Sequence, residues 1–498
     1  MPVGRDVVIQ PVVAVSKNSI NLREKKILSL LKLLATMENK KFKLSKWCHF
    51  FIIKNDAVAV FHSLSMFVAF FDVNKGNKLK ALKTVKHFKK THISFLDEED
   101  LSLLLDENLI VSSSFDELQQ IYDLRENLLK NLRLDLMHLL LTDSCNMKCL
   151  YCFEDSPSKP KNFSETMMSE KTASQSIDFF SSLTKRYGSI DGDKVIHLYG
   201  GEPLLNFSAL KSAVLRTEEL KGSGVLSKKT NLVLITNGLL LTEEKADFLA
   251  ENKVSIGLSI DGPKHLNDIY RISKDGNEVF SRIIKAYKII NERNINVGLS
   301  VTLTPDVVNN FSEVLDFLIN DLKIKDGLTF NILHYNPKVP TSDDYFEKSA
   351  DCIIRAFKVF RELNIYEERM MRKVKSFVNQ EPMFADCGVV GNQIVIAPNG
   401  QVGVCQDFVK PKTYFGKFIN DFGYNPVKDG LFDEWRKRSP LFMEECFDCE
   451  AVAICGGGCP ASVELKTGDR WNIDKRICPH SKKTLNWLVL ESFQNVDF

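Results

Sequence analysis

The stretch LLTDSCNMKCLYCFED, residues 140–155, holds three of the twelve cysteines of this 498-residue chain. Their spacing is C-x3-C-x2-C, from Cys145 through Cys149 to Cys152, and no further Cys or His follows until His197. A tetrahedral zinc site would be one ligand short with these three thiolates. A four-iron cluster with one open iron would be complete. The stretch therefore predicts an iron–sulfur site.

The composition is typical of a soluble globular protein, with 44% hydrophobic and 26% charged residues. Its length allows about two to four domains. The formal net charge of +2 gives no electrostatic case for nucleic acid or for an acidic membrane surface. We therefore expect neither as a partner.

The sequence also points to a cellular compartment. The N-terminus has no sustained apolar segment followed by a small-residue cleavage site, and no apolar run approaches the ~20 residues of a membrane span. The cysteines are clustered, which in a cytosolic protein indicates metal or redox chemistry rather than disulfides. We expect a cytoplasmic protein that does not cross a membrane.

Outward from the cysteine stretch, strand-like apolar runs alternate six times with helical segments. The runs are residues 132–142, 194–200, 231–237, 254–261, 295–304 and 327–336. Strand followed by helix, repeated, indicates parallel βα units with strands buried beneath helices. Six units fall short of a closed eight-stranded barrel, so we expect an α/β fold with a partial (βα)6 TIM-type barrel. Its active-site residues should follow the C-terminal ends of the strands.

Three further regions flank this barrel, which we place at residues 131–335. Residues 1–130 predict a small α+β domain, with strands near 49–55, 57–63 and 66–73 and helices near 20–37, 97–110 and 114–132. The basic stretch 78–90 is either a solvated lysine face or a docking surface for an acidic partner. Residues 336–385 predict a helical linker, and residues 386–498 a cysteine-rich domain.

The C-x3-C-x2-C motif after the first strand of such a barrel resembles the radical S-adenosylmethionine (SAM) superfamily. The resemblance implies that Cys145, Cys149 and Cys152 are catalytic residues that bind three irons of a [4Fe–4S] cluster. The fourth iron would chelate the amino and carboxylate groups of SAM, and cleavage of SAM would give a 5′-deoxyadenosyl radical. An electron donor such as flavodoxin or ferredoxin is implied as a partner.

Other segments at the same rim of the barrel resemble the motifs by which this superfamily binds SAM. Gly200-Gly201-Glu202-Pro203 resembles the segment that holds the SAM ammonium group. Tyr151 resembles the aromatic residue packed against adenine. The remaining expected contacts are Ser259 and Arg271, toward the ribose and carboxylate, and Asn237 on the same rim.

The cysteine-rich region resembles the SPASM domain, which carries two auxiliary [4Fe–4S] clusters and would bring the total to three. Its pattern is C-x12-G-x4-C, then C-x2-C-x5-C-x3-C, then a last cysteine. The resemblance implies that Cys387, Cys405 and Cys459 bind the first auxiliary cluster. The second would be bound by Cys446, Cys449, Cys455 and Cys478. The alternative is a pair of structural zinc sites, although seven thiols are an awkward number for two zincs.

Two cysteines remain outside these motifs. Cys48 and Cys352 are expected to be small buried hydrophobic residues. Cys352 is also a candidate for a fourth ligand to the first auxiliary cluster. Without such a ligand, that cluster would have an open iron able to bind a substrate thiolate.

The resemblance implies a maturase that installs a thioether or carbon–carbon crosslink in a ribosomally made precursor peptide. The N-terminal region would be a winged-helix-like domain that binds the leader peptide as an added strand. A second hypothesis is a sulfatase-type maturase that makes formylglycine. That family has an Asp base directly after a cluster cysteine, and here Asp407 follows Cys405 with one residue between them. A third, an iron–sulfur electron carrier, leaves the rim motifs without a purpose.

Overall fold

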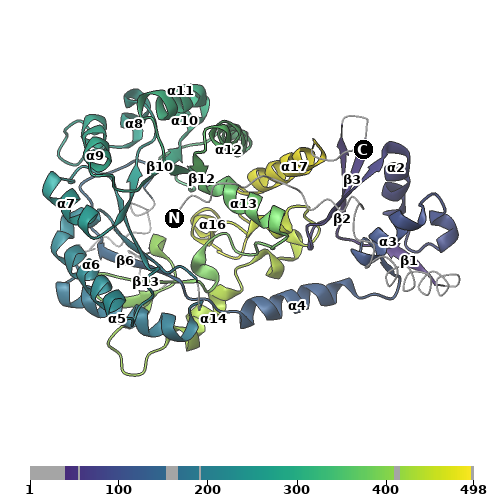
Figure 1. Cartoon of the computed structure of the whole chain (residues 1–498), viewed down its shortest axis with the longest axis horizontal. Helices are drawn as coiled ribbons and strands as arrows, with labels where there is room; N and C mark the ends of the chain where they lie inside the picture. The colour runs from purple at the N-terminus through teal and green to yellow at the C-terminus, as the bar shows by residue number, and fades with distance from the viewer. Residues whose placement is uncertain (1–39, 54–56, 153–165, 190–191, 409–414, 495–498) are drawn as a thin grey trace.

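The computed structural model describes residues 40–53, 57–152, 166–189, 192–408 and 415–494. The helix predicted near residues 20–37 lies outside these ranges. Figure 1 shows the barrel strands and their helices on the left and the N-terminal strands on the right. The long helix α4 (Glu117–Lys130) runs between these two parts.

Six parallel strands form the barrel predicted from the sequence. They are β6 (Leu136–Thr142), β7 (Val195–Gly200), β8 (Asn231–Thr236), β9 (Ser255–Ser259), β10 (Val297–Leu303) and β11 (Gly327–Ile332). Each strand pairs in parallel with the next in chain order. The (βα)6 prediction is confirmed, and all six strands end at the same rim.

Helices connect these strands and cover their outer face. They are α5 (Glu170–Tyr187), α6 (Phe207–Gly222), α7 (Glu243–Glu251), α8 (Lys264–Tyr270), α9 (Phe280–Glu292), α10 (Pro305–Asn309) and α11 (Phe311–Asp316), with the short turns η3 (Pro203–Asn206) and η4 (Phe317–Asp321). Hydroxyl caps begin several of them. The Ser169 hydroxyl accepts a hydrogen bond from the Thr172 amide of α5, and Thr242 does the same for Lys245 of α7.

Alternate residues of the barrel strands face two different environments. In β9, Ile256 and Leu258 are buried, whereas Ser255, Gly257 and Ser259 are half-buried. The same alternation runs along β10 and β11, where Ser300, Thr302, Thr329 and Asn331 are the half-buried positions. Because side chains of a strand alternate between its faces, the apolar set packs under the helices and the small polar set lines the barrel interior. The interior is therefore partly open.

The sheet extends beyond the six barrel strands at both edges. The two-residue strand β12 (Tyr366–Glu367) pairs with β11, and β13 (Gln393–Ile396) pairs in parallel with β6. Strand β14 (Gln401–Gly403) pairs antiparallel with β13, and β15 (Phe415–Phe418) pairs antiparallel with β14. The cysteine-rich region thus begins as part of the barrel sheet, which the sequence did not predict.

Helices make up most of the rest of the C-terminal half. They are α12 (Tyr345–Glu362), α13 (Glu368–Asn379), α14 (Gly430–Arg436), α15 (Val452–Cys455), α16 (Pro460–Thr467) and α17 (Cys478–Gln494). The 3-10 turns are η5 (Gly388–Val390), η6 (Gln406–Phe408), η7 (Pro426–Lys428), η8 (Pro440–Phe442) and η9 (Glu444–Cys446). Helices α12 and α17 pack against each other, so the segment expected to be a linker is part of the core.

The described N-terminal residues form an α+β unit with two small sheets. Strands β2 (Cys48–Ile53), β3 (Ala57–His62) and β4 (Val68–Asp72) form an antiparallel sheet, and β1 (Phe42–Leu44) pairs with β5 (Ile110–Ser112). The helical segments are α2 (Val73–Leu82), η1 (Lys90–Ile93), α3 (Glu98–Asp106) and α4. The three predicted strands and the two predicted helices that fall in the described residues are present.

This unit packs against the C-terminal helices through aromatic side chains. Phe61 of β3 stacks on Phe377 of α13 with ring centroids 6.2 Å apart, and Phe70 of β4 lies 5.4 Å from Phe493 of α17. On α4, the Arg125 guanidinium donates a 2.7 Å hydrogen bond to the Leu441 carbonyl. The N-terminal unit is therefore fixed to the cysteine-rich region rather than tethered to it.

Candidate active site

The segment that carries Cys145, Cys149 and Cys152 lies just beyond the end of β6. Its backbone pairs with residues 270–274, because the Lys148 amide donates to the Ile272 carbonyl at 2.8 Å and the Leu150 amide to the Tyr270 carbonyl at 2.9 Å. The Met147 amide also donates to the Cys145 sulfur at 3.4 Å. N–H donors of this kind stabilise a thiolate that binds a metal.

The glycine pair after β7 lies directly against this segment. The Gly201 amide donates to the Thr142 carbonyl at 2.9 Å, and the Glu202 amide donates to the Ser144 carbonyl at 2.8 Å. A Cβ on Gly200 would lie 2.2 Å from the Thr142 oxygen, and one on Gly201 would lie 2.2 Å from the Ser144 oxygen. Gly200 also has a φ of +136°. Both positions therefore require glycine so that the two rim segments can approach this closely.

Glu202 is buried and binds the next strand along the rim. Its carboxylate accepts hydrogen bonds from the Thr236 hydroxyl at 2.7 Å, the Asn237 amide at 2.9 Å and the Leu204 amide at 3.0 Å. Burial raises the pKa of this carboxyl group, and the three donors oppose that shift. Its carboxylate thus fixes the ends of β7 and β8 relative to each other, while Pro203 begins the turn η3.

Asn237 extends this connection to the cysteine segment. Its side-chain amide donates to the Asn146 oxygen at 2.8 Å, and its nitrogen lies 3.9 Å from the Cys145 sulfur. A chain of contacts therefore runs from Glu202 through Asn237 to Cys145. The rim position predicted for Asn237 is the one it occupies.

A buried ion pair lies on the other side of the cysteine segment. The Arg271 guanidinium donates from Nε to Asp261 Oδ2 at 2.9 Å and from Nη2 to Oδ1 at 3.1 Å. The Tyr151 hydroxyl donates to Oδ2 at 2.5 Å, and the Thr302 amide donates to Oδ1 at 2.9 Å. Burial opposes the positive charge of Arg271, but Asp261 outweighs it and raises the arginine pKa. Asp261 was not among the site residues predicted from the sequence, although it is the last residue of the strand-like run 254–261.

Ser259 is brought to the same region from the end of β9. It is half-buried and belongs to the small polar set that lines the barrel interior. The guanidinium carbon of Arg271 lies 5.6 Å from the centre of the Tyr151 ring, within cation–π range. The rim thus presents an aromatic ring and a hydroxyl, groups that suit the adenine and ribose of a ligand, while the Arg271 charge is compensated by Asp261.

Cys387, Cys405 and Cys459 come together from the loop before η5, the end of the β14 region and the start of α16. Burial raises the pKa of Cys405, and the charges of Cys459 and Cys387 add to this shift. Burial raises the pKa of Cys387 to about 12, although the residue exposes surface. The raised pKa and the exposed surface of Cys387 are consistent with each other if its side chain faces a space that the three cysteine-bearing segments enclose.

A second group contains the other four cysteines of this region. Burial raises the pKa of Cys478 to about 12, and the thiols of Cys455, Cys449 and Cys446 add to the shift. The pKa of Cys446 is also raised to about 12 by burial, followed by Cys455 and Cys449. These electrostatic contacts divide the seven thiols into groups of three and four. The residues fit two auxiliary iron–sulfur sites with the membership that the SPASM resemblance implies.

Cys48 and Cys352 lie away from both groups. Cys48 is fully buried in β2, and its thiol is 3.5 Å from the Leu109 carbonyl. Cys352 is buried in α12 with its sulfur 3.9 Å from the Val308 carbonyl. The charges that act on Cys352 are those of Asp351 and Arg355, not those of other cysteines. The prediction that both are buried hydrophobic residues is confirmed, and the structure does not place Cys352 with the first auxiliary group.

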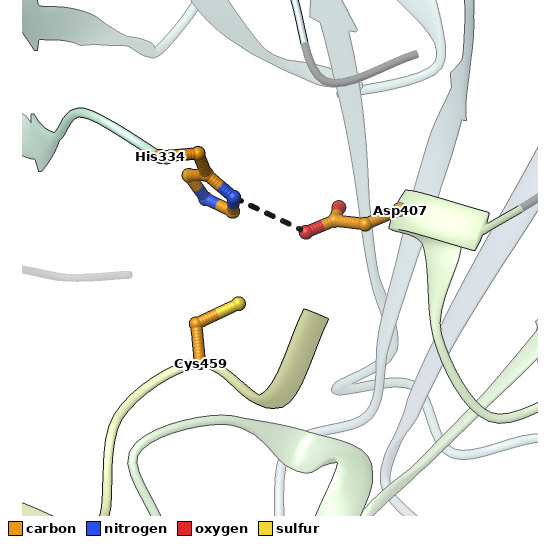
Figure 2. Close-up of side chains that lie close together, drawn as sticks. All are labelled: His334, Asp407 and Cys459. Carbon is orange, nitrogen blue, oxygen red and sulfur yellow. Dashed lines mark ion pairs between the residues drawn. The ribbon is translucent and has the colours of Figure 1, made fainter. Parts of the chain in front are cut away.

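Asp407 is brought beside Cys459 and a histidine that the sequence did not single out. Ligand atoms of His334, Asp407 and Cys459 all lie within 4.8 Å of one another, and Figure 2 shows the three side chains pointing toward a common space. His334 Nδ1 is 4.0 Å from Asp407 Oδ2. Burial raises the pKa of Asp407 to about 7, and burial lowers that of His334 to about 3. His334 follows the end of β11 within the strand-like run 327–336, and this position after a barrel strand was the signal that the sequence offered.

The comparison with protein families decides the identity of the barrel. Residues 139–318 match the model of the radical SAM superfamily. This part of the chain is a radical SAM domain. Radical SAM proteins bind SAM and a [4Fe–4S] cluster, and the family match spans β6 to α11, which contain the C-x3-C-x2-C motif and most of the rim.

Similar proteins include two kinds of radical SAM enzyme. The chain is 24% identical over 362 residues to a radical SAM cyclopropyl synthase from Paramaledivibacter caminithermalis, covering 71% of this chain and 73% of that protein. It is 24% identical over 333 residues to a cysteine-type anaerobic sulfatase-maturating enzyme from Clostridium perfringens, covering 64% of this chain and 86% of that enzyme. These relatives identify the radical SAM protein as an enzyme.

A solved structure supports the fold. Native anSMEcpe with bound AdoMet superposes with a TM-score of 0.59 at 22% identity, covering 72% of this chain and 98% of that one. Among the helices of the described residues, none has both the length and the apolar character that a membrane crossing needs. The described part of this radical SAM protein therefore contains no candidate membrane helix.

Proposed function

We propose that this radical SAM enzyme installs a thioether or carbon–carbon crosslink in a ribosomally synthesised precursor peptide. The single observation that carries the peptide substrate is the N-terminal unit, which is separate from the barrel yet fixed to the C-terminal helices. In its three-stranded sheet, among the described residues, β2 and β4 each pair only with β3. A strand edge of this kind can accept an extended peptide through backbone hydrogen bonds.

The proposed cofactor ligands are those expected from the sequence. Cys145, Cys149 and Cys152 would hold the SAM-binding cluster, and the paired backbone of residues 146–150 would hold these thiols in place. When bound, the cluster and SAM supply a 5′-deoxyadenosyl radical that abstracts hydrogen from a substrate carbon. SAM would contact the Gly200–Pro203 segment, Tyr151 and Arg271.

The partly open barrel interior supports the proposal from the substrate side. Ser300, Thr302, Thr329 and Asn331 are half-buried polar side chains of its lining. The Asn331 amide donates to the Ser300 hydroxyl at 2.9 Å, which orients one polar edge of this lining. A radical has little selectivity of its own, so these side chains and the N-terminal unit would select the carbon by holding it near the reacting centre.

A second candidate is formation of formylglycine in a sulfatase. The position of Asp407 favours it, because the carboxylate lies beside His334 and Cys459 at the barrel end of the cysteine-rich region. The sulfatase-maturating relative is similar over 333 residues, or 64% of this chain. In this reading Asp407 is the catalytic base that removes a proton from the substrate side chain.

One experiment tests the proposal and separates the candidates. Anaerobically reconstituted enzyme is mixed with SAM, dithionite and either a precursor peptide from a neighbouring reading frame or a sulfatase peptide that contains Cys. Mass spectrometry should show a loss of two hydrogens with a linked pair of residues in the precursor. An aldehyde in the sulfatase peptide would support the second candidate, and absence of 5′-deoxyadenosine in every mixture would contradict both.

A further inference from the structure

The first auxiliary group contains three thiols, whereas the second contains four. A [4Fe–4S] cluster presents one ligand position on each iron, so three cysteines leave one iron for another group. Cys352 does not fill this position, because its thiol contacts the Val308 carbonyl of α10. The question is which described side chain occupies the fourth corner.

Asp407 stands where a fourth ligand is needed. It lies in η6, two residues after Cys405, and its carboxylate oxygen is within 4.8 Å of the Cys459 sulfur. Figure 2 shows its carboxylate directed into the space that the Cys459 sulfur also faces. Two side chains two residues apart can thus reach one metal site from a single turn.

The charge of Asp407 also acts on all three thiols. It is among the causes that raise the pKa of Cys387, of Cys405 and of Cys459. Asp386 acts in this way on Cys387, and Asp474 acts on Cys459. The contact that places Asp407 beside this group is the approach of its carboxylate to within 4.8 Å of the Cys459 sulfur.

We propose that Asp407 is the fourth protein ligand of the first auxiliary cluster, together with Cys387, Cys405 and Cys459. The proposal rests on the assignment of these three thiols to one cluster, which the SPASM resemblance implies. A carboxylate there closes the cluster, which therefore does not bind a substrate thiolate. His334, 4.0 Å from the carboxylate, is a positioning residue that limits its rotation.

This assignment has a chemical consequence that can be measured. Carboxylate oxygen is a harder ligand than thiolate sulfur, and the identity of its ligands sets the reduction potential of an iron–sulfur cluster. The potential of the first auxiliary cluster should therefore differ from that of the second, which has four thiolates. Replacing Asp407 by Cys should bring the two potentials closer.

The test uses full-length protein in which Cys145, Cys149 and Cys152 are replaced by Ala, so that only the auxiliary clusters remain. In this background we expect about eight irons per chain, and Asp407→Ala should lose about one of them and give the EPR signal of an oxidised [3Fe–4S] cluster. Asp407→Cys should retain all irons and shift the midpoint potential of one cluster. Because this background cannot cleave SAM, the result does not depend on the proposed peptide chemistry.

Matched controls separate ligation from general damage. Asp386→Asn removes the carboxylate that accepts from Arg372 at 3.3 Å beside Cys387, and it should leave the iron content and EPR spectrum unchanged. His334→Gln should keep four irons in the cluster without any change in nitrogen couplings in pulsed EPR. An unchanged potential and spectrum in both Asp407 variants would overturn the proposal. Loss of nitrogen couplings in His334→Gln would show that His334, not Asp407, is the fourth ligand of the cluster. Protein that holds one zinc ion and lacks the first auxiliary cluster would also overturn the proposal.

Discussion

Arg271 and Asp261 form a bidentate ion pair at the barrel rim, in which both side chains are almost fully buried, with 6% and 1% of their surface exposed. The pair joins the segment after α8 to the end of β9. Since the backbone next to Arg271 also pairs with the cysteine segment, the ion pair fixes the position of the proposed iron ligands from one side.

Asp261→Asn should therefore destabilise the protein strongly. The substitution keeps the shape of the side chain but leaves the Arg271 charge buried without its partner, which should lower the unfolding free energy by about 3 kcal/mol or more. Denaturant unfolding of the anaerobically purified protein measures this loss. Asp178→Asn, which removes an exposed partner of Arg216, is the control and should change stability far less because solvent screens that pair. Equal effects of the two variants would contradict this role of the rim pair.

The three cysteines after β6 should account for one cluster. Replacing Cys145, Cys149 and Cys152 by Ala should remove about four irons per chain and abolish formation of 5′-deoxyadenosine. Iron analysis and chromatography of the nucleoside measure the two effects. Cys352→Ala should leave both unchanged, because this buried thiol lies outside the cysteine groups. Continued SAM cleavage by the triple variant would show that the assignment is wrong.

Gly201→Ala should displace the cysteine segment. The added Cβ would lie 2.2 Å from the Ser144 oxygen, so either this backbone or the β7 loop must move. We expect SAM affinity to fall about tenfold or more, equal to ~1.4 kcal/mol. Equilibrium binding of SAM to the reconstituted protein checks this. Gly222→Ala, where an added Cβ meets nothing within 4 Å, is the control and should bind SAM normally.

The four-cysteine group should matter for folding as well as for redox chemistry. If Cys446 and Cys449 bind the second auxiliary cluster, their metal–thiolate bonds would tie the segment before α15 to the start of α17, so replacing both by Ala should give iron-poor protein of low solubility. Metal analysis of anaerobically purified wild-type protein is the companion measurement. Zinc in place of about eight irons would contradict the SPASM interpretation.

The basic stretch 78–90 contributes to a hollow in the N-terminal unit. The hollow has a volume of about 390 Å³ and is lined by Lys41, Lys86, His87, Phe88, Lys89 and His92. Charge reversal at Lys86 and Lys89 should weaken binding of an acidic leader peptide by no more than about tenfold, since we place the main contact at a sheet edge.

Fluorescence anisotropy of a labelled leader measures that change, with Lys228→Glu, on the exposed loop before β8, as the control. Complete loss of binding in the double variant would make the basic hollow the main contact. This substitution is a cleaner test than deletion of residues 1–130. Deletion would uncover Phe377 and Phe493, which pack on the N-terminal strands.

The six barrel strands could be predicted because each is an apolar run bounded by turn residues, and chain order alone sets their neighbours. The pairing of β13 with β6 could not be predicted in this way. Gln393 lies opposite Leu136, more than 250 residues earlier in the chain, and a four-residue strand carries no signal for a partner so distant.

The site shows the same division between local and distant information. Motif spacing identified the cysteines and the glycine pair, but it did not show that the Glu202 carboxylate binds the end of β8. Asp261 and His334 stood in segments that the strand-end rule had marked. Their partners, Arg271 and Asp407, are revealed only when the strands and loops are folded together.

The parallel pairing of β13 with β6 has a consequence for how electrons would move through the molecule. Strand β6 leads into the Cys145 segment, and β13 leads through β14 to Cys405, so one hydrogen-bonded sheet carries both cysteine regions. Electron tunnelling weakens steeply with separation, and a tether between domains would let that separation fluctuate. Here the spacing is held by backbone hydrogen bonds, so the rate of exchange between the two regions should be insensitive to solvent viscosity.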